Sequence, residues 1–242
     1  WFNPPTTFSP LIAGRLPEVD DPRCIELAPG WNMIGNTFNA GLNVWAMVVD
    51  TGTVAYTLPE AMLAGLVQPV WRYGSAGYYE VAPSLSAWEG GWMRNLTSGT
   101  LVLRQQDASR STRDAQVDPF RLLTDGGWGI RLQAAAGATR DAMAVAGINP
   151  KARGGIDGLD WQKPPAMGNG VRVAFINPAN RIAGAAYATD IRQTLAAGGE
   201  TWEFEVTTPR TEAVTLSWPD LRGLPRGYEL ILEDLTSGQR RY

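Results

Sequence analysis

The sequence predicts an all-β protein that folds as two β-sandwiches with short helical insertions. Short apolar runs recur along the chain, and several of them alternate strictly with polar residues, as half-buried strands do. The 27 glycines and 17 prolines are spread between these runs and form no low-complexity blocks, which favours short strands and turns over long helices. With 242 residues, the chain is long enough for two ordinary domains.

The first half reads as an arm followed by a β domain. Residues 1–22 are rich in proline and predict an extended arm, and residues 23–106 predict the first β domain. Pro59 in a first turn and Gly65 as a stop predict one short helix over residues 59–64. Strands are predicted at residues 24–28, 31–35, 44–49, 69–73, 77–81, 88–94 and 100–104.

Residues 107–125 lose the apolar periodicity and gain charge, which predicts a linker. The second β-sandwich is expected over residues 126–242. The Gly- and Ala-rich segment 134–165 predicts a long ordered crossover between strands. Strands are predicted at residues 128–133, 171–175, 202–206, 214–218 and 228–234.

Histidine is absent from the sequence, and Cys24 is the only cysteine. Ser-His-Asp and Cys-His catalysis, His-ligated zinc and haem, and a disulfide within the chain are therefore excluded. No GxGxxG or P-loop motif supports nucleotide binding. We expect a non-enzymatic protein with no cofactor, in which Cys24 is a small buried hydrophobe.

Charge and hydropathy exclude two further partner classes. The net charge is only −3, and basic residues form no stripe, so nucleic acid is not an expected partner. No apolar run approaches the roughly 20 residues that cross a bilayer, so no membrane span is expected.

Aromatic residues supply the first candidate site. Trp31, Trp202 and Trp218 fall at strand positions that predict core packing. Other rings cluster around the 69–81 hairpin and the following strand, where flat faces can stack on sugars or pack in an interface. The candidate polysaccharide-binding residues are Trp71, Tyr73, Tyr78, Tyr79, Trp88 and Trp92.

Carboxylates supply the second candidate site. Asp141, Asp157 and Asp160 lie in the long crossover and offer oxygen ligands for calcium, although aspartate also makes local turns. Glu203 and Glu205 share one face of an alternating strand, which predicts a solvated face and not a catalytic pair.

The run GWNMIGN at residues 30–36 resembles the "GWN-x-IGN" strand of large bacterial secreted and cell-surface multidomain proteins. Thr37 departs from the proline that is usual next in that pattern. The resemblance extends over roughly residues 24–242. The other matching segments are 71–73, 77–78, 88–92, 202–206, 216–218, 225–230 and 235–238.

The resemblance implies an extracellular or cell-surface location in bacteria and immunoglobulin-like β-sandwiches, and it implies no reaction. We therefore expect a structural or interaction module of a larger assembly, which other protein chains join by strand addition at a sheet edge. Two alternatives stay open at this point. The chain is a carbohydrate-binding module that uses exposed aromatic rings, or an accessory region of a larger secreted enzyme.

Overall fold

The computed structural model describes residues 23–74, 77–106, 117–167, 170–176, 185–193, 199–208, 211–221 and 223–241. The predicted arm 1–22 and most of the predicted linker lie outside the described residues. Strands dominate the described part, and the sheets are mainly antiparallel, so the predicted all-β class is confirmed. No helix in this part of the chain is long and apolar enough to cross a membrane.

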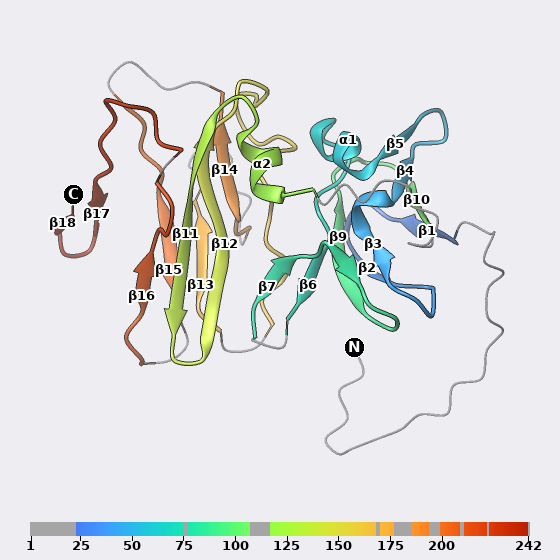
Figure 1. The fold of residues 1–242 in the computed structure, drawn as a ribbon, viewed down its shortest axis with the longest axis horizontal. Helices are drawn as coiled ribbons and strands as arrows, with labels where there is room; N and C mark the ends of the chain where they lie inside the picture. The colour runs from blue at the N-terminus through green and yellow to red at the C-terminus, as the bar shows by residue number, and fades with distance from the viewer. Residues whose placement is uncertain are drawn as a thin grey trace.

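The first half contains two four-stranded antiparallel sheets and a short strand pair (Figure 1). The first sheet has the order β1 (Arg23–Leu27), β10 (Leu101–Gln105), β4 (Val48–Asp50), β5 (Ala55–Thr57). The second has the order β2 (Gly30–Gly35), β9 (Gly90–Asn95), β6 (Trp71–Tyr73), β7 (Tyr79–Val81). The short pair is β3 (Leu42–Asn43) with β8 (Ser84–Leu85), and a 3-10 turn follows β3 at Val44–Ala46.

The two asparagines of the GWNMIGN run hold the backbone around β2. Asn32 accepts from the backbone N–H of Ala28 at 2.9 Å and donates to its carbonyl at 2.8 Å. Gly30 at that corner has φ +88°, a conformation that glycine adopts without steric cost. The buried Asn36 donates to the carbonyls of Ala40, Leu85 and Ser86. These contacts let one chain segment leave β1 and enter the other sheet.

Helix α1 (Leu58–Leu63) confirms the predicted helix. The Glu60 carboxylate accepts from the Thr57 backbone N–H at 2.9 Å and from its hydroxyl at 2.8 Å, which caps the helix start. Pro59 stands in the first turn, where no helical donor is needed. Leu58, Ala61 and Met62 are buried and fix α1 to the core.

The second half has a four-stranded sheet that faces a two-stranded one. The larger sheet has the order β14 (Thr189–Arg192), β12 (Thr139–Ile148), β11 (Trp128–Ala136), β16 (Thr215–Ser217), with β12 and β14 parallel. The smaller sheet is β13 (Arg172–Phe175) with β15 (Phe204–Thr207). Helix α2 (Pro119–Thr124) precedes them, and a hairpin of β17 (Leu232–Glu233) and β18 (Arg240–Arg241) follows.

Part of the predicted crossover 134–165 is instead the strand β12, which pairs with β11 along most of its length. Sequence patterns do not predict this strand, because small residues stand where β-branched residues are usual. Gly147 is required for the close approach, since a Cβ there would lie 2.5 Å from the Trp128 carbonyl oxygen. The predicted strand at 228–234 is also shorter, and only Leu232–Glu233 pairs.

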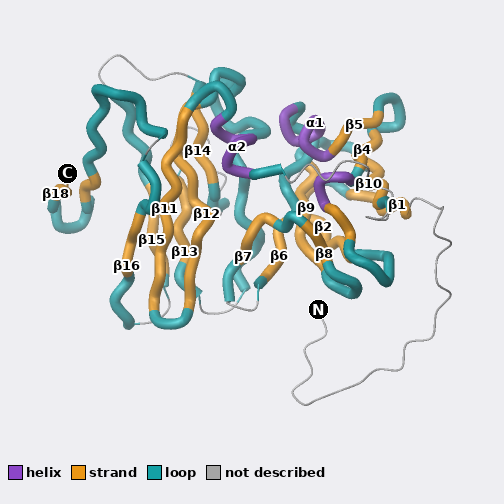
Figure 2. Tube along the Cα trace, in the orientation of Figure 1, coloured by secondary structure: helices purple, strands orange, loops and turns teal. Residues whose placement is uncertain are grey.

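One hydrophobic core joins the two halves. It contains most buried residues of the first half together with Leu123, Val145, Leu159, Trp161 and Ile191 of the second. Strands β7 and β12 lie side by side at this junction, and Figure 2 shows both α-helices at one end of it.

Close backbone contacts and a side-chain amide lock the junction. Gly158 lies against the end of α1, where a Cβ would come within 2.3 Å of the Met62 carbonyl oxygen. The buried Gln68 amide donates to the Asp160 carbonyl and accepts from the Gln162 N–H, each at 3.1 Å. The two halves therefore share buried polar contacts as well as apolar ones.

A second core lies between the two sheets of the second half and includes Trp128, Val173 and Phe175. Trp202 and Trp218 pack against it, and Trp31 packs against the first core, so the predicted core packing of these rings is confirmed. The prediction for Cys24 is wrong, because its side chain is exposed. Along β1 the exposure alternates, and Cys24 lies on the outer side while Leu27 is buried.

Candidate functional site at the junction of the two halves

Strand pairing places four of the six predicted aromatic residues on one face of a sheet. Trp71 lies opposite Trp92, and Tyr73 lies opposite Tyr79. Directly paired residues point to the same side, so these rings share the face that meets the second half. Trp71 is fully buried, and the Tyr73 hydroxyl donates to the Met167 carbonyl at 3.2 Å. This face therefore forms part of the junction and is not an open platform.

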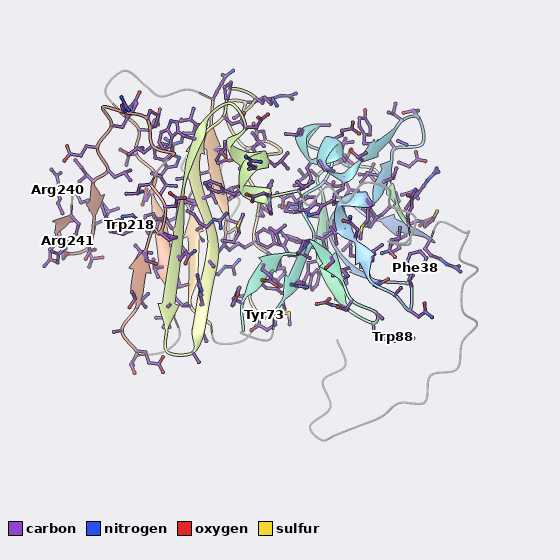
Figure 3. The ribbon with its side chains drawn as sticks, viewed as in Figure 1. Phe38, Tyr73, Trp88, Trp218, Arg240 and Arg241 are labelled. Atoms are coloured by element: carbon purple, nitrogen blue, oxygen red, sulfur yellow. The ribbon has the colours of Figure 1, made fainter. Side chains whose placement is uncertain are left out.

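Trp88 is placed differently from the other rings. Its side chain is 80% exposed, and its φ of +66° is the only positive φ of a non-glycine residue in the described chain. It lies in a turn closed by the Glu89 N–H donating to the Ser86 carbonyl at 3.0 Å. Figure 3 shows Trp88 at the edge of the first half, away from Tyr73.

A small pocket of about 50 Å³ opens where the aromatic face meets the second half. A cavity that binds benzene measures about 150 Å³, so this space suits a group of a few atoms and is too small for a sugar ring. Among the six predicted aromatic residues, Trp88 and Trp92 do not line it. Its lining is Trp71, Tyr73, Gly77, Tyr78, Tyr79, Asp141, Lys163, Ala166, Met167, Gly170, Val171 and Arg172.

A buried ion pair between Lys163 and Asp141 forms one wall of the pocket. The Asp141 carboxylate also accepts from the backbone N–H of Val173 at 2.9 Å and of Met143 at 3.2 Å. Burial lowers the pKa of Lys163, and the adjacent Asp141 charge opposes this shift. Asp141 belongs to β12 and accepts from a backbone N–H of β13, so both strands hold the carboxylate of the pair.

Arg172 and Tyr79 form the other polar wall. Burial lowers the pKa of Arg172, against the attraction of Asp141, and one guanidinium nitrogen donates to the Pro164 carbonyl at 3.1 Å. Burial raises the pKa of Tyr79, whereas the neighbouring Trp92 indole and the Arg172 charge lower it. Neither the Tyr79 hydroxyl nor the Trp92 indole N–H has full hydrogen-bond geometry with any described group.

The three predicted calcium ligands do not converge. Asp141 belongs to the ion pair, whereas Asp160 accepts from the backbone N–H of Ile191 and of Asp157, each at 3.0 Å. Asp157 accepts from the N–H of Leu159 at 2.7 Å, as an aspartate in a turn does. In the described ranges, no three acidic or cysteine side chains gather as a metal ion requires.

Asp160 makes the stability of the fold depend on pH. Burial raises its pKa to about 7, with the Asp157 and Asp190 charges adding to the shift and two backbone N–H groups opposing it. In the unfolded chain this carboxyl has a pKa of 3.8. Between pH 3.8 and about pH 7, the folded state therefore keeps a proton that the unfolded state has lost. Stability falls as pH rises through this range. From about pH 5.5 to about pH 8.5, we expect a loss of about 2 kcal/mol.

Urea unfolding at the two pH values measures this loss. Asp160→Asn is expected to flatten the pH dependence, whatever its effect on absolute stability. Asp125→Asn removes an exposed aspartate and serves as the control that keeps the wild-type dependence. An equal dependence in Asp160→Asn and wild type would show that another group carries it.

No family model, curated protein or solved structure matches this chain. Sequence reasoning missed Lys163 and Arg172 as pocket residues. The available signal was a lone lysine between Gln162 and Pro164, in a chain whose basic residues are almost all arginine.

Proposed function

We propose that this protein is a non-enzymatic structural module of a bacterial extracellular or cell-surface protein, in which two immunoglobulin-like β-sandwiches act as one rigid body. The observation that carries the proposal is that one of the two cores includes residues of both halves. Its aromatic face packs at the junction, where the only space beside it is too small for a sugar ring. The sequence resemblance supplies the bacterial surface location.

Partner chains are proposed to join this module by strand addition. Strand β15 pairs only with β13 among the described strands, and three of its four residues are exposed. An edge of this kind presents backbone N–H and C=O groups to an incoming strand. This property suits a subunit or spacer of a larger assembly.

A carbohydrate-binding role is the second candidate, and Trp88 is the observation that favours it. A bulky residue in a left-handed conformation costs about 1–3 kcal/mol and is found most often at functional positions. Its exposed ring offers a flat face of the kind that stacks on sugars. The other predicted aromatic residues give this reading less support, because they pack at the junction or lie around a pocket too small for a sugar ring.

Titration with polysaccharides, followed by tryptophan fluorescence and by release of reducing sugar, separates the two roles. The structural role predicts no saturable fluorescence change and no hydrolysis with any glycan. A saturable change that Trp88→Ala removes would favour the carbohydrate-binding role. Met33→Ala, which truncates another exposed apolar side chain of the first half, is the matched control and should leave such a change intact.

A further inference from the structure

The pocket at the junction carries more positive than negative charge. Among the described residues that line it, only Lys163, Arg172 and Asp141 are charged, and Asp141 is already paired with Lys163. The one hydrogen bond identified for the Arg172 guanidinium goes to a neutral carbonyl, that of Pro164. Arg172 is half-buried and shares the nearby Asp141 charge with Lys163, so its guanidinium has no carboxylate of its own and the pocket favours an anion.

Two further donors in the pocket lining lack an acceptor. The Trp71 indole N–H and the Tyr79 hydroxyl are buried, and neither has a hydrogen-bond partner among the described residues. Buried polar groups in folded proteins are nearly always paired, so unpaired donors in one lining indicate a missing acceptor. An anionic acceptor would balance the net positive charge of the pocket and pair with both donors.

The size of the pocket limits what this anion can be. About 50 Å³ accommodates one small group and excludes a sugar or a nucleotide. A guanidinium presents its N–H groups in a planar fork that matches the two oxygens of a carboxylate. The aromatic rings of Tyr73 and Tyr79 border the same space and suit a short apolar stem behind such a group.

We propose that this pocket binds one carboxylate group, with Arg172 as its main ligand and the Tyr79 hydroxyl as a second donor. The carboxylate comes either from a small organic acid or from a protein chain, as an acidic side chain or a chain end. The inference does not rest on the proposed structural role, because the shared core would make the module rigid with or without this ligand.

Thermal unfolding in sodium formate tests the proposal, with formate replacing sodium chloride at constant ionic strength. The expected result is a rise in the unfolding midpoint of the wild type that continues with the logarithm of the formate concentration, as binding to the folded state alone produces. Arg172→Gln should weaken the apparent affinity at least about tenfold. Arg121→Gln, which alters an exposed arginine of α2, should leave it unchanged.

Tyr79→Phe removes only the hydroxyl and keeps the ring, so it remains informative if Arg172→Gln does not fold. It should weaken formate binding severalfold.

N-acetyl-diglycine, its carboxy-terminal amide and a capped peptide with one glutamate then distinguish a chain end from an acidic side chain. The absence of any rise relative to sodium chloride, or a rise that both variants share with the wild type, would overturn the proposal.

Discussion

Replacing Trp161 with alanine is expected to lower the free energy of unfolding by about 3–5 kcal/mol. The side chain is fully buried in the core that spans both halves, and its indole N–H donates to the Gly158 carbonyl at 3.0 Å. The Trp161 backbone carbonyl accepts from the Ala188 N–H at 2.6 Å. The truncation leaves a cavity at the junction, so both halves should lose stability together.

Urea unfolding followed by fluorescence and by far-ultraviolet circular dichroism measures this effect. The two probes should give one midpoint that shifts as a whole. Trp88→Ala truncates a tryptophan that is 80% exposed and should change stability by less than about 1 kcal/mol. If Trp161→Ala cost no more than this control, or destabilised only one half, Trp161 would not join the halves.

Asp141→Asn is expected to cost about 3–5 kcal/mol, because it leaves the buried Lys163 ammonium without its counter-charge. The backbone N–H of Val173 also loses a charged acceptor. Adding Lys163→Met removes the stranded charge, so the double variant should recover a large part of the loss. Stability of the four proteins in one thermodynamic cycle gives the interaction energy.

The exposed pair of Asp125 and Lys151 is the matched control for this cycle. Both side chains are more than half exposed, so Asp125→Asn should cost no more than about 1 kcal/mol. If Asp141→Asn and Asp125→Asn lowered the free energy of unfolding equally, burial of the Asp141 and Lys163 pair would not explain a larger loss there. A double variant no more stable than Asp141→Asn alone would show that the stranded charge is not the cause.

Local patterns predicted the parts of the fold that local chemistry determines. The helix at 59–64 follows from Pro59 and its cap, and the 69–81 hairpin follows from aromatic residues around a short turn. The strand β12 could not be predicted this way, because its Ala and Gly residues are selected by close packing against β11. That packing depends on the folded partner strand.

The site was harder to predict than the strands. Alternation shows that Trp71 and Tyr73 share a face, but it cannot show that the second half covers that face. Asp141, Lys163 and Arg172 come from separate segments that meet only in the folded chain. Charge counts along the sequence therefore gave no sign of a buried pair with an additional arginine beside it.

Scanning calorimetry of the whole chain tests the central claim, that one shared core makes the two halves a single rigid unit. The claim predicts one unfolding transition whose calorimetric enthalpy equals its van't Hoff enthalpy. Two separate transitions, or a calorimetric enthalpy well above the van't Hoff value, would contradict it and show that the halves unfold independently.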